Sequence, residues 1–320
     1  MRSVTLPGTD LTTSRLGFGS TGGRISDRER LRLYEAAFDH GITHFDTARA
    51  YGLGAAEAVL GKFLVRRRDE VTITTKLGIV PPNSGPFLRA AKRTARTVER
   101  LLPSAGARAK QVAGNRLLTG RRFSVDEARA SLETSLRELR TDYVDIVLLH
   151  ECAESDLSED LMTYLDARIH AGDVRFTGIA TGPEDTASIM ASNFDFPRVI
   201  QVANSVTEPN LERLSVGSRA TITHSPFRAG FTRLREALAS SPDSRERWVS
   251  ELRTDYSEEA LLTLMLLYSL RANRTGIVLF YSQREGHIVT DAMTASRAPA
   301  FSDEQVAAFA RLVREEGASP

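Results

Sequence analysis

Residues 43–78 read THFDTARAYGLGAAEAVLGKFLVRRRDEVTITTKLG, and this stretch decides the fold. It contains two short runs rich in β-branched and aromatic residues, Thr43–Thr47 and Val71–Lys76, with a segment of helical spacing between them. A strand, a helix and a second strand in this order predict a βαβ unit with parallel strands. Polar side chains, Asp46 and Lys76, stand where the two strands end.

The same alternation extends along the whole chain. Stretches with apolar residues three and four positions apart lie between the strand-like runs, and Ser26 with Glu29 three residues later marks one helix start. Eight βα units favour a closed (β/α)8 TIM barrel over an open sheet, and the 320 residues agree with a single domain, 1–320. The six further strands are expected at Arg15–Gly19, Tyr143–His150, Arg175–Ala180, Arg198–Ala203, Ala220–Ser225 and Gly276–Tyr281.

The connection after the third strand, residues 79–123, is too long for an ordinary barrel loop. From Arg89 to Arg122 it holds ten Lys or Arg against one acid, Glu99. We therefore predict a basic insertion. Its amphipathic part is most simply a solvated helix face, and the sharper alternative is a docking surface for an anionic or carrier-bound substrate.

The overall charge and the single cysteine exclude several classes of protein. With 42 basic and 41 acidic residues the net charge is +1, which indicates neither a nucleic-acid partner nor a membrane partner. The longest apolar run, near Ala260–Leu270, is too short to span a bilayer. Cys152 excludes an internal disulfide, and Met1–Asp10 has no signal-peptide core, so we expect a cytoplasmic protein. The sequence indicates no oligomeric state.

Four residues are predicted to meet at the barrel mouth. Asp46, Lys76 and His150 end successive strands, and Tyr51 follows where the chain should turn over the same rim. Because a cation stabilises a phenolate, Lys76 would lower the pKa of Tyr51 and help it to donate a proton. Asp46 would hold Lys76 in place, and His150 would hydrogen-bond the substrate oxygen. Each residue alone has an ordinary structural explanation, but together they favour proton transfer to a carbonyl.

The motifs that carry these residues resemble the aldo-keto reductase family along nearly the whole chain. The resemblance implies a barrel that reduces an aldehyde or ketone by hydride transfer from NADPH. Tyr51 would be the general acid in a tetrad with Asp46, Lys76 and His150. The matching segments are Leu16–Gly19, Phe45–Ala48 with Tyr51–Gly52, Thr75–Gly78, Asp142–Asp145 with Leu148–His150, and Ser225–Pro226.

The resemblance is weaker around the nicotinamide. Family members hold its carboxamide with a Ser-Asn pair after strand five and a Gln in strand six, and they stack the ring on an aromatic residue of strand seven. Here Gln201 is present, and Thr181 stands near the place of the pair, where it could hydrogen-bond the amide. His224 stands where the family commonly has Tyr and could stack on the ring, and Ser225 follows it. Gly19, at the end of the first strand, is expected to leave room for substrate or cofactor.

Around strand eight the family binds the adenosine 2′-phosphate and the adenine. This sequence offers Ser282, Arg284 and His287, whose hydroxyl and cationic donors suit a phosphate dianion, and Asp291 near the adenine. NADP(H) is therefore favoured over NAD(H). The departures leave two alternatives open, a redox-neutral lyase or isomerase and a cofactor-binding protein without catalysis.

A Rossmann-like glycine motif is set aside. Gly17, Gly19 and Gly22 spell GxGxxG, but the cap at Ser26 places the next helix too far beyond Gly22 for a dinucleotide-binding turn.

His150, Glu151 and Cys152 resemble metal ligands, yet adjacent residues point in different directions, so no metal site is predicted. We expect Cys152 to be a small wall residue, with substrate contact as the alternative. Trp248, in the long connection 228–254, is expected to pack rather than to bind a ligand.

Overall fold

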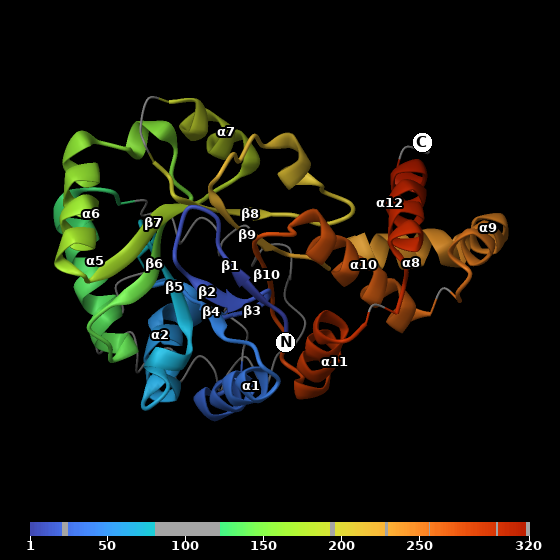
Figure 1. The fold of residues 1–320 in the computed structure, drawn as a ribbon, viewed down its shortest axis with the longest axis horizontal. Coiled ribbons are helices and arrows are strands. Elements are labelled where there is room, and N and C mark those ends of the chain that lie inside the picture. Colours follow the sequence, from blue (N-terminus) through green and yellow to red (C-terminus); the bar gives the residue numbers. More distant parts are fainter. Residues whose placement is uncertain are drawn as a thin grey trace, which may run out of the picture.

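Eight parallel strands close into a barrel in a computed structural model of the protein (Figure 1). The predicted (β/α)8 barrel is confirmed, with each strand within two residues of its expected bounds. The structure describes residues 1–20, 25–80, 122–192, 196–227, 230–255, 257–298 and 300–317. In barrel order the strands are β10 (Ile277–Phe280), β3 (Leu16–Gly19), β4 (His44–Asp46), β5 (Thr72–Leu77), β6 (Val144–His150), β7 (Val174–Ala180), β8 (Val199–Ala203) and β9 (Ala220–His224).

Helices surround the barrel, and their starts follow the predicted capping signals. Ser26 forms a capping box with Glu29 at the start of α1, and the Ser124 hydroxyl accepts from the Glu127 amide at the start of α5. The barrel helices are α1 (Asp27–Asp39), α2 (Ala56–Leu64), α5 (Val125–Leu139), α6 (Glu159–Ala171), α7 (Pro183–Ala191), α10 (Glu258–Ala272) and α11 (Glu285–Ser296). Short 3₁₀ turns occur at η1 (Tyr51–Gly54), η2 (Arg68–Glu70), η3 (Glu154–Asp156) and η4 (Asn210–Arg213).

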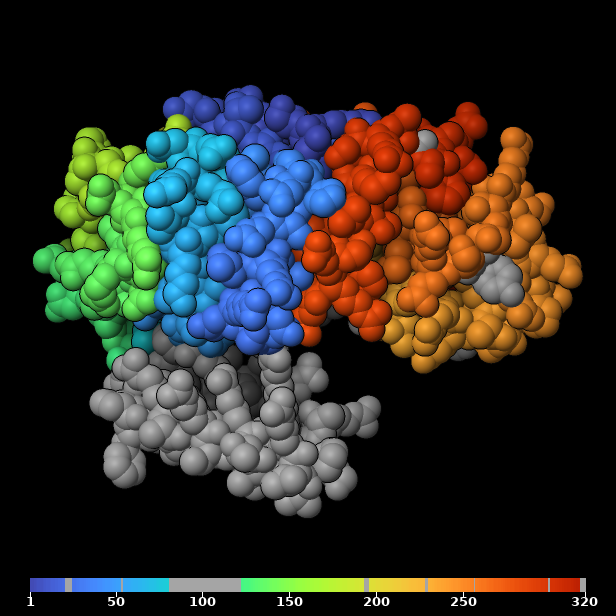
Figure 2. Space-filling view, turned by 90° about the horizontal axis from the view of Figure 1, so that it is seen from below, coloured from blue at the N-terminus to red at the C-terminus, as the bar shows by residue number. Residues whose placement is uncertain are grey.

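A two-stranded hairpin precedes the barrel and was not predicted. Its strands, β1 (Ser3–Thr5) and β2 (Thr12–Ser14), pair antiparallel. The turn between them inserts Leu6 and Leu11, each 1% exposed, among apolar residues of the barrel strands. The hairpin (deep blue) lies at the upper end of the barrel in Figure 2 and closes the end where the strands begin.

The long connection after β9 forms two helices, α8 (Gly230–Ser240) and α9 (Pro242–Leu252). With α10 and the last helix, α12 (Asp303–Gly317), they make a helical cluster beside the barrel (Figure 1, orange to red). Trp248 is fully buried there and meets Phe309 edge-on at 5.7 Å between ring centroids. The expectation that Trp248 packs is confirmed.

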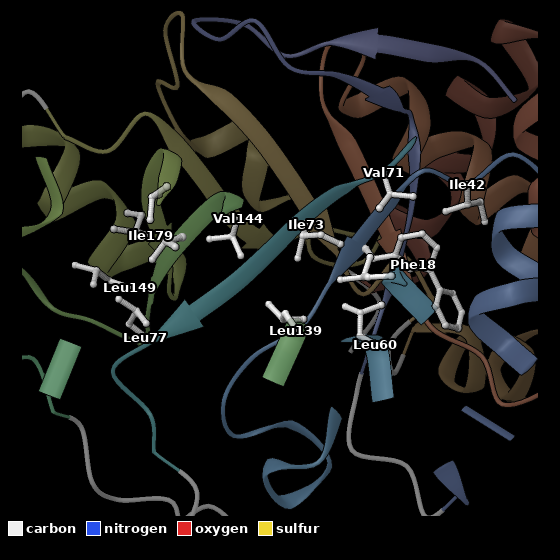
Figure 3. Close-up of a cluster of buried hydrophobic side chains, with 14 of the residues drawn as sticks. Phe18, Ile42, Leu60, Val71, Ile73, Leu77, Leu139, Val144, Leu149 and Ile179 are labelled. Atoms are coloured by element: carbon white, nitrogen blue, oxygen red, sulfur yellow. The ribbon is translucent and has the colours of Figure 1, made fainter. Parts of the chain in front are cut away.

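The main core lies between the strands and the helices. Figure 3 shows Ile73 and Leu77 of β5 in this cluster with Val144 and Leu149 of β6. Because side chains alternate along a strand, the residues between Ile73 and Leu77 divide between the two faces, and Lys76 points into the barrel. Among the described residues no helix is long and apolar enough to cross a membrane.

Candidate active site

Asp46 and Lys76 form a buried ion pair at the carboxyl ends of β4 and β5. Lys76 Nζ lies 2.5 Å from Asp46 Oδ1 and donates a second hydrogen bond to the Thr47 carbonyl at 3.0 Å. Asp46 is 3% exposed and Lys76 is 1% exposed. A buried charge is tolerated only when it is paired and hydrogen-bonded, and both conditions are met.

Gln201 of β8 holds the second oxygen of the Asp46 carboxylate. Its amide nitrogen, Nε2, donates to Asp46 Oδ2 at 2.7 Å across the barrel. The sequence indicated Gln201 only as a cofactor ligand. No local pattern could have shown the contact, because 155 positions separate the two residues.

Tyr51 and His150 lie against this ion pair. The Tyr51 ring centroid is 4.9 Å from Lys76 Nζ, and the rings of Tyr51 and His150 meet edge-to-face at 5.9 Å. The structure therefore brings together all four residues that the sequence placed at the mouth.

The pKa of Tyr51 is raised above its ordinary value of about 10. Burial is the largest cause, whereas Lys76 lowers the pKa by charge and by a hydrogen bond, and Asp46 raises it. The expected effect of Lys76 is thus present, but burial outweighs it. Tyr51 consequently stays protonated at neutral pH, as a proton donor must.

Lys76 and His150 shift in opposite directions. Burial lowers the pKa of Lys76, but the Asp46 carboxylate and Tyr51 together raise it by more than burial lowers it. The pKa of Lys76 is therefore raised, and Lys76 stays charged. Burial, followed by the charges of Lys76 and His224, lowers the pKa of His150 to about 3. His150 is therefore neutral at physiological pH and presents one N–H donor.

The next strand ends carry the residues expected near a nicotinamide. Thr181 follows β7, and its hydroxyl donates to the Cys152 carbonyl at 3.0 Å. His224 ends β9, and its Nδ1 lies 2.9 Å from the Ser225 hydroxyl. Ser225 itself has a φ of 66°, in the left-handed region. With Gln201, these residues lie around the carboxyl ends of adjacent strands.

The residues expected near the adenosine lie at the start of α11. The Ser282 hydroxyl accepts from the Arg284 amide at 3.1 Å, and Arg284 precedes the first residue of the helix. Arg284 and His287 are exposed. Asp291, on the next turn of α11, is half-buried, and burial raises its pKa to about 7.

Cys152 is fully enclosed, and burial raises the pKa of its thiol to about 12. The burial agrees with the interpretation as a small wall residue packed in the core. Among the glycines, a Cβ at Gly19 would meet only the Phe280 carbonyl, at 3.6 Å, so its surroundings do not demand glycine. At Gly17 a Cβ would lie 2.6 Å from Leu279 Cδ2, so glycine is needed for packing.

His44, which the sequence did not single out, lies inside the barrel below Asp46. Its ring nitrogens contact the hydroxyls of Thr72 at 2.8 Å and Thr74 at 3.3 Å. Burial lowers its pKa to about 3, with a smaller contribution from Lys76. Strand alternation could have placed His44 on the inward face, since it stands two residues before Asp46.

Two groups of predictions are limited by the described ranges. Residues 81–121 of the basic insertion, and Gly22, lie outside them. Within the described ranges no three His, Cys, Asp or Glu side chains are arranged to hold a metal ion.

Comparison with known proteins identifies the family. The family model described as "Aldo/keto reductase family" matches residues 15–313. A probable aldo-keto reductase of Glycine max is 27% identical over 180 residues, which are 54% of this chain and 43% of that protein. D-threo-aldose 1-dehydrogenase of Pseudomonas sp is 28% identical over 226 residues, 68% of this chain and 60% of that protein. The chain thus spans about half the length of the curated relatives it matches.

Solved structures share the barrel. The glycerol dehydrogenase of Gluconobacter oxydans superimposes with a TM-score of 0.71 at 17% identity, covering 99% of this chain and 97% of that one. An aldo-keto reductase from Klebsiella pneumoniae, solved in complex with NADPH, gives 0.65 at 20% identity, covering 98% and 96%. At these identities the likeness shows the fold.

Proposed function

The chain belongs to the aldo/keto reductase family, and we propose that it reduces an aldehyde or ketone to an alcohol with NADPH, using Tyr51 as the general acid. The observation that carries the proposal is the buried group at the mouth. A protonated phenol, a buried ammonium and a neutral imidazole converge there within the distances given above.

Proton donation follows from the charges of these residues. Tyr51 gives its proton to the carbonyl oxygen and becomes a phenolate, which the Lys76 ammonium stabilises. His150, being neutral, donates a hydrogen bond to the same oxygen while negative charge develops on it. Asp46 keeps Lys76 charged and fixed. These interactions are stronger at a buried mouth than in water.

The donor and acceptor groups at the mouth fit a nicotinamide carboxamide. The Thr181 hydroxyl donates to the Cys152 carbonyl, and the Gln201 amide nitrogen donates to the Asp46 carboxylate. Both side chains therefore offer an oxygen as acceptor, which suits the NH2 of the carboxamide. When bound, the nicotinamide supplies the hydride.

The start of α11 fits a phosphate. Arg284 and His287 supply exposed nitrogen donors, and a helix N-terminus attracts negative charge. The Ser282 hydroxyl donates to the Arg284 carbonyl at 3.2 Å and would turn from it to reach a phosphate. These groups favour NADP(H) over NAD(H), and the complex of the Klebsiella pneumoniae neighbour with NADPH supports the same choice. Asp291 would lie near the adenine.

The substrate is a small molecule with a carbonyl group. An anionic or carrier-bound substrate stays a prediction from the basic insertion. A cytoplasmic location likewise stays a prediction from the sequence.

Fluorescence titration of the purified protein with NADPH and NADH tests the cofactor. We expect tighter binding of NADPH, and binding of neither cofactor would overturn the proposal.

Tyr51→Phe then separates an enzyme from a binding protein. The variant should bind NADPH as the wild type does but lose about 10²- to 10⁴-fold in carbonyl turnover, the usual contribution of a general acid. If the wild type binds NADPH and turns over no member of a carbonyl panel, a cofactor-binding protein replaces the reductase. Turnover of a substrate without net oxidation or reduction would instead indicate a lyase or isomerase.

A further inference from the structure

Glu57 is a carboxylate buried in the wall of the barrel. It lies on α2 and is 1% exposed, among the buried apolar residues of that helix. A buried carboxylate is costly unless it is paired, and apolar residues of similar volume often replace buried ion pairs without loss of stability. Its presence in this layer therefore indicates a role that an apolar side chain would not fill.

The two oxygens of Glu57 contact residues that stand next to two parts of the active site. Oε2 lies 2.7 Å from Arg49 Nη1, and Oε1 accepts a hydrogen bond of 2.6 Å from the Thr75 hydroxyl. Arg49 lies in the loop between Asp46 and Tyr51. Thr75 directly precedes Lys76 on β5, and its side chain points outward while that of Lys76 points inward.

The loop that carries Tyr51 has a permissive backbone. Gly52 and Gly54 have φ values of 60° and 88°, which glycine adopts without strain and other residues rarely adopt. Lys76, in contrast, is held by Asp46 and by the Thr47 carbonyl. The position of the Tyr51 ring over Lys76 therefore depends on what holds the loop, and small displacements of catalytic groups have large effects on rate.

We propose that Glu57 is a positioning residue that fixes the Tyr51 loop, through Arg49, against the end of the strand that carries Lys76, through Thr75. The contact with Arg49 holds the Tyr51 loop in position, and the contact with Thr75 anchors Glu57 to β5. Glu57 touches none of the reacting atoms. The effect of Glu57 on catalysis rests on the proposed function, whereas its role in holding Arg49 and Thr75 together does not.

Asp145 provides a matched control. It is also 1% exposed and also pairs with arginine, at 2.8 Å from Arg68 Nη2 and 3.1 Å from Arg175 Nη1. It stands at the beginning of β6, the end of the barrel opposite the mouth. Glu57→Gln and Asp145→Asn each remove one buried charge, so they share any general effect on folding.

The test measures the titration of Tyr51 in the protein without cofactor. Phenolate absorbance is recorded for each variant and for its Tyr51→Phe counterpart, and the difference isolates Tyr51. In E57Q the neutral amide no longer pairs with the Arg49 guanidinium as a charge, and its single oxygen can accept from only one of Arg49 and Thr75, so the loop is held less tightly. Because burial is the main cause of the raised pKa of Tyr51, we expect that pKa to fall toward about 10 in E57Q. D145N should leave it unchanged.

Turnover provides the second measurement. We expect E57Q to lower kcat by about 10- to 100-fold, in the range that misplaced catalytic groups show, with unchanged NADPH affinity. Thr75→Val removes a single hydroxyl and should fold even where E57Q does not. T75V should lower the pKa of Tyr51 as E57Q does, but by a smaller amount. Arg49→Lys keeps the cation and should retain most of the wild-type kcat.

Two results would overturn the tie. One is an unchanged Tyr51 titration in E57Q, or in T75V where E57Q fails to fold. The other is an equal shift in E57Q and D145N, which would make Glu57 merely structural. The proposed function fails separately, if the wild type neither binds NADPH nor reduces a carbonyl while the Tyr51 titration still responds to E57Q.

Discussion

The two ends of the barrel bury the same kind of ion pair and use it differently. At the mouth Asp46 pairs with Lys76, whereas at the opposite end Asp145 pairs with Arg68 and Arg175. Asp145 also accepts from the Ile73 amide at 2.9 Å, so it joins β6 to β5. Both carboxylates are nearly inaccessible to water.

Arg68 and Lys76, the cations of the two ion pairs, differ in the side chains that lie around them. Arg68 donates to Asp145 and to the backbone carbonyls of Val71 and Tyr143, and it stacks on the Tyr143 ring. An arginine stays charged at all relevant pH values, so it has no proton to exchange at this end. Both cations thus lie against a tyrosine ring, but at the mouth Tyr51 also meets His150, a neutral imidazole. The convergence of Lys76, Tyr51 and His150 distinguishes the mouth from the opposite end.

The largest effect is expected from Lys76→Met. It should lower carbonyl reduction by about 10³-fold, because the phenolate loses its cation. The pKa of Tyr51 should rise further, since Lys76 lowers it. Single-turnover kinetics and the Tyr51 titration measure the two effects, at a temperature where circular dichroism shows a folded protein. Near-wild-type turnover would remove the functional difference between the two ends.

Asp145→Asn should affect stability rather than chemistry. Removing one partner of a buried ion pair leaves the other charge uncompensated, so we expect the free energy of unfolding to fall by about 3 kcal/mol. Denaturant unfolding measures this loss. The kcat of the folded fraction should not change, and a large drop in kcat would mean that this end also takes part in catalysis.

His44 lies between the two ends and should make the protein sensitive to acid. Its pKa is about 3 in the folded protein and about 6.5 when unfolded, so between these values only the unfolded state binds the proton. Stability is therefore lost as the pH falls below about 6.5. From about pH 7 to about pH 4.5 the wild type should lose about 2 kcal/mol more than His44→Gln. His170→Gln, at an exposed site, is the control, and equal losses in wild type and H44Q would contradict the expectation.

Asp291 is a third carboxylate, whose pKa is raised by burial alone. A raised carboxyl pKa means that the folded state holds the proton longer, so stability falls as the pH rises from about 4 to about 7. Asp291→Asn should therefore stabilise the cofactor-free protein by about 1 kcal/mol at about pH 8, a value reduced for partial exposure, and not at about pH 4. Thermal unfolding with Asp142→Asn, at an exposed turn, as control checks this. No gain for D291N at the higher pH would show that burial does not disfavour the charge.

Much of the fold could be predicted because local sequence patterns indicate its strands and helices. The strand runs located all eight barrel strands, although η4 takes the place of an α-helix between β8 and β9, and the polar ends of β4, β5 and β6 located Asp46, Lys76 and His150. The hairpin β1–β2 was missed because each strand has three residues and little apolar periodicity. In the helical cluster beside the barrel, α8 and α9 were expected only as a long connection.

The sequence by itself determined which residues reach the mouth, since strand period and chain order bring the strand ends to one rim. Only the tertiary structure decided their partners and their electrostatics. Gln201 reaches Asp46 across the barrel, and Glu57 joins Arg49 to Thr75 between helix and strand. The pKa of Tyr51 shows the reason: a neighbouring cation can be read from the chain, but burial depends on every element packed around the ring, and here burial outweighs the cation.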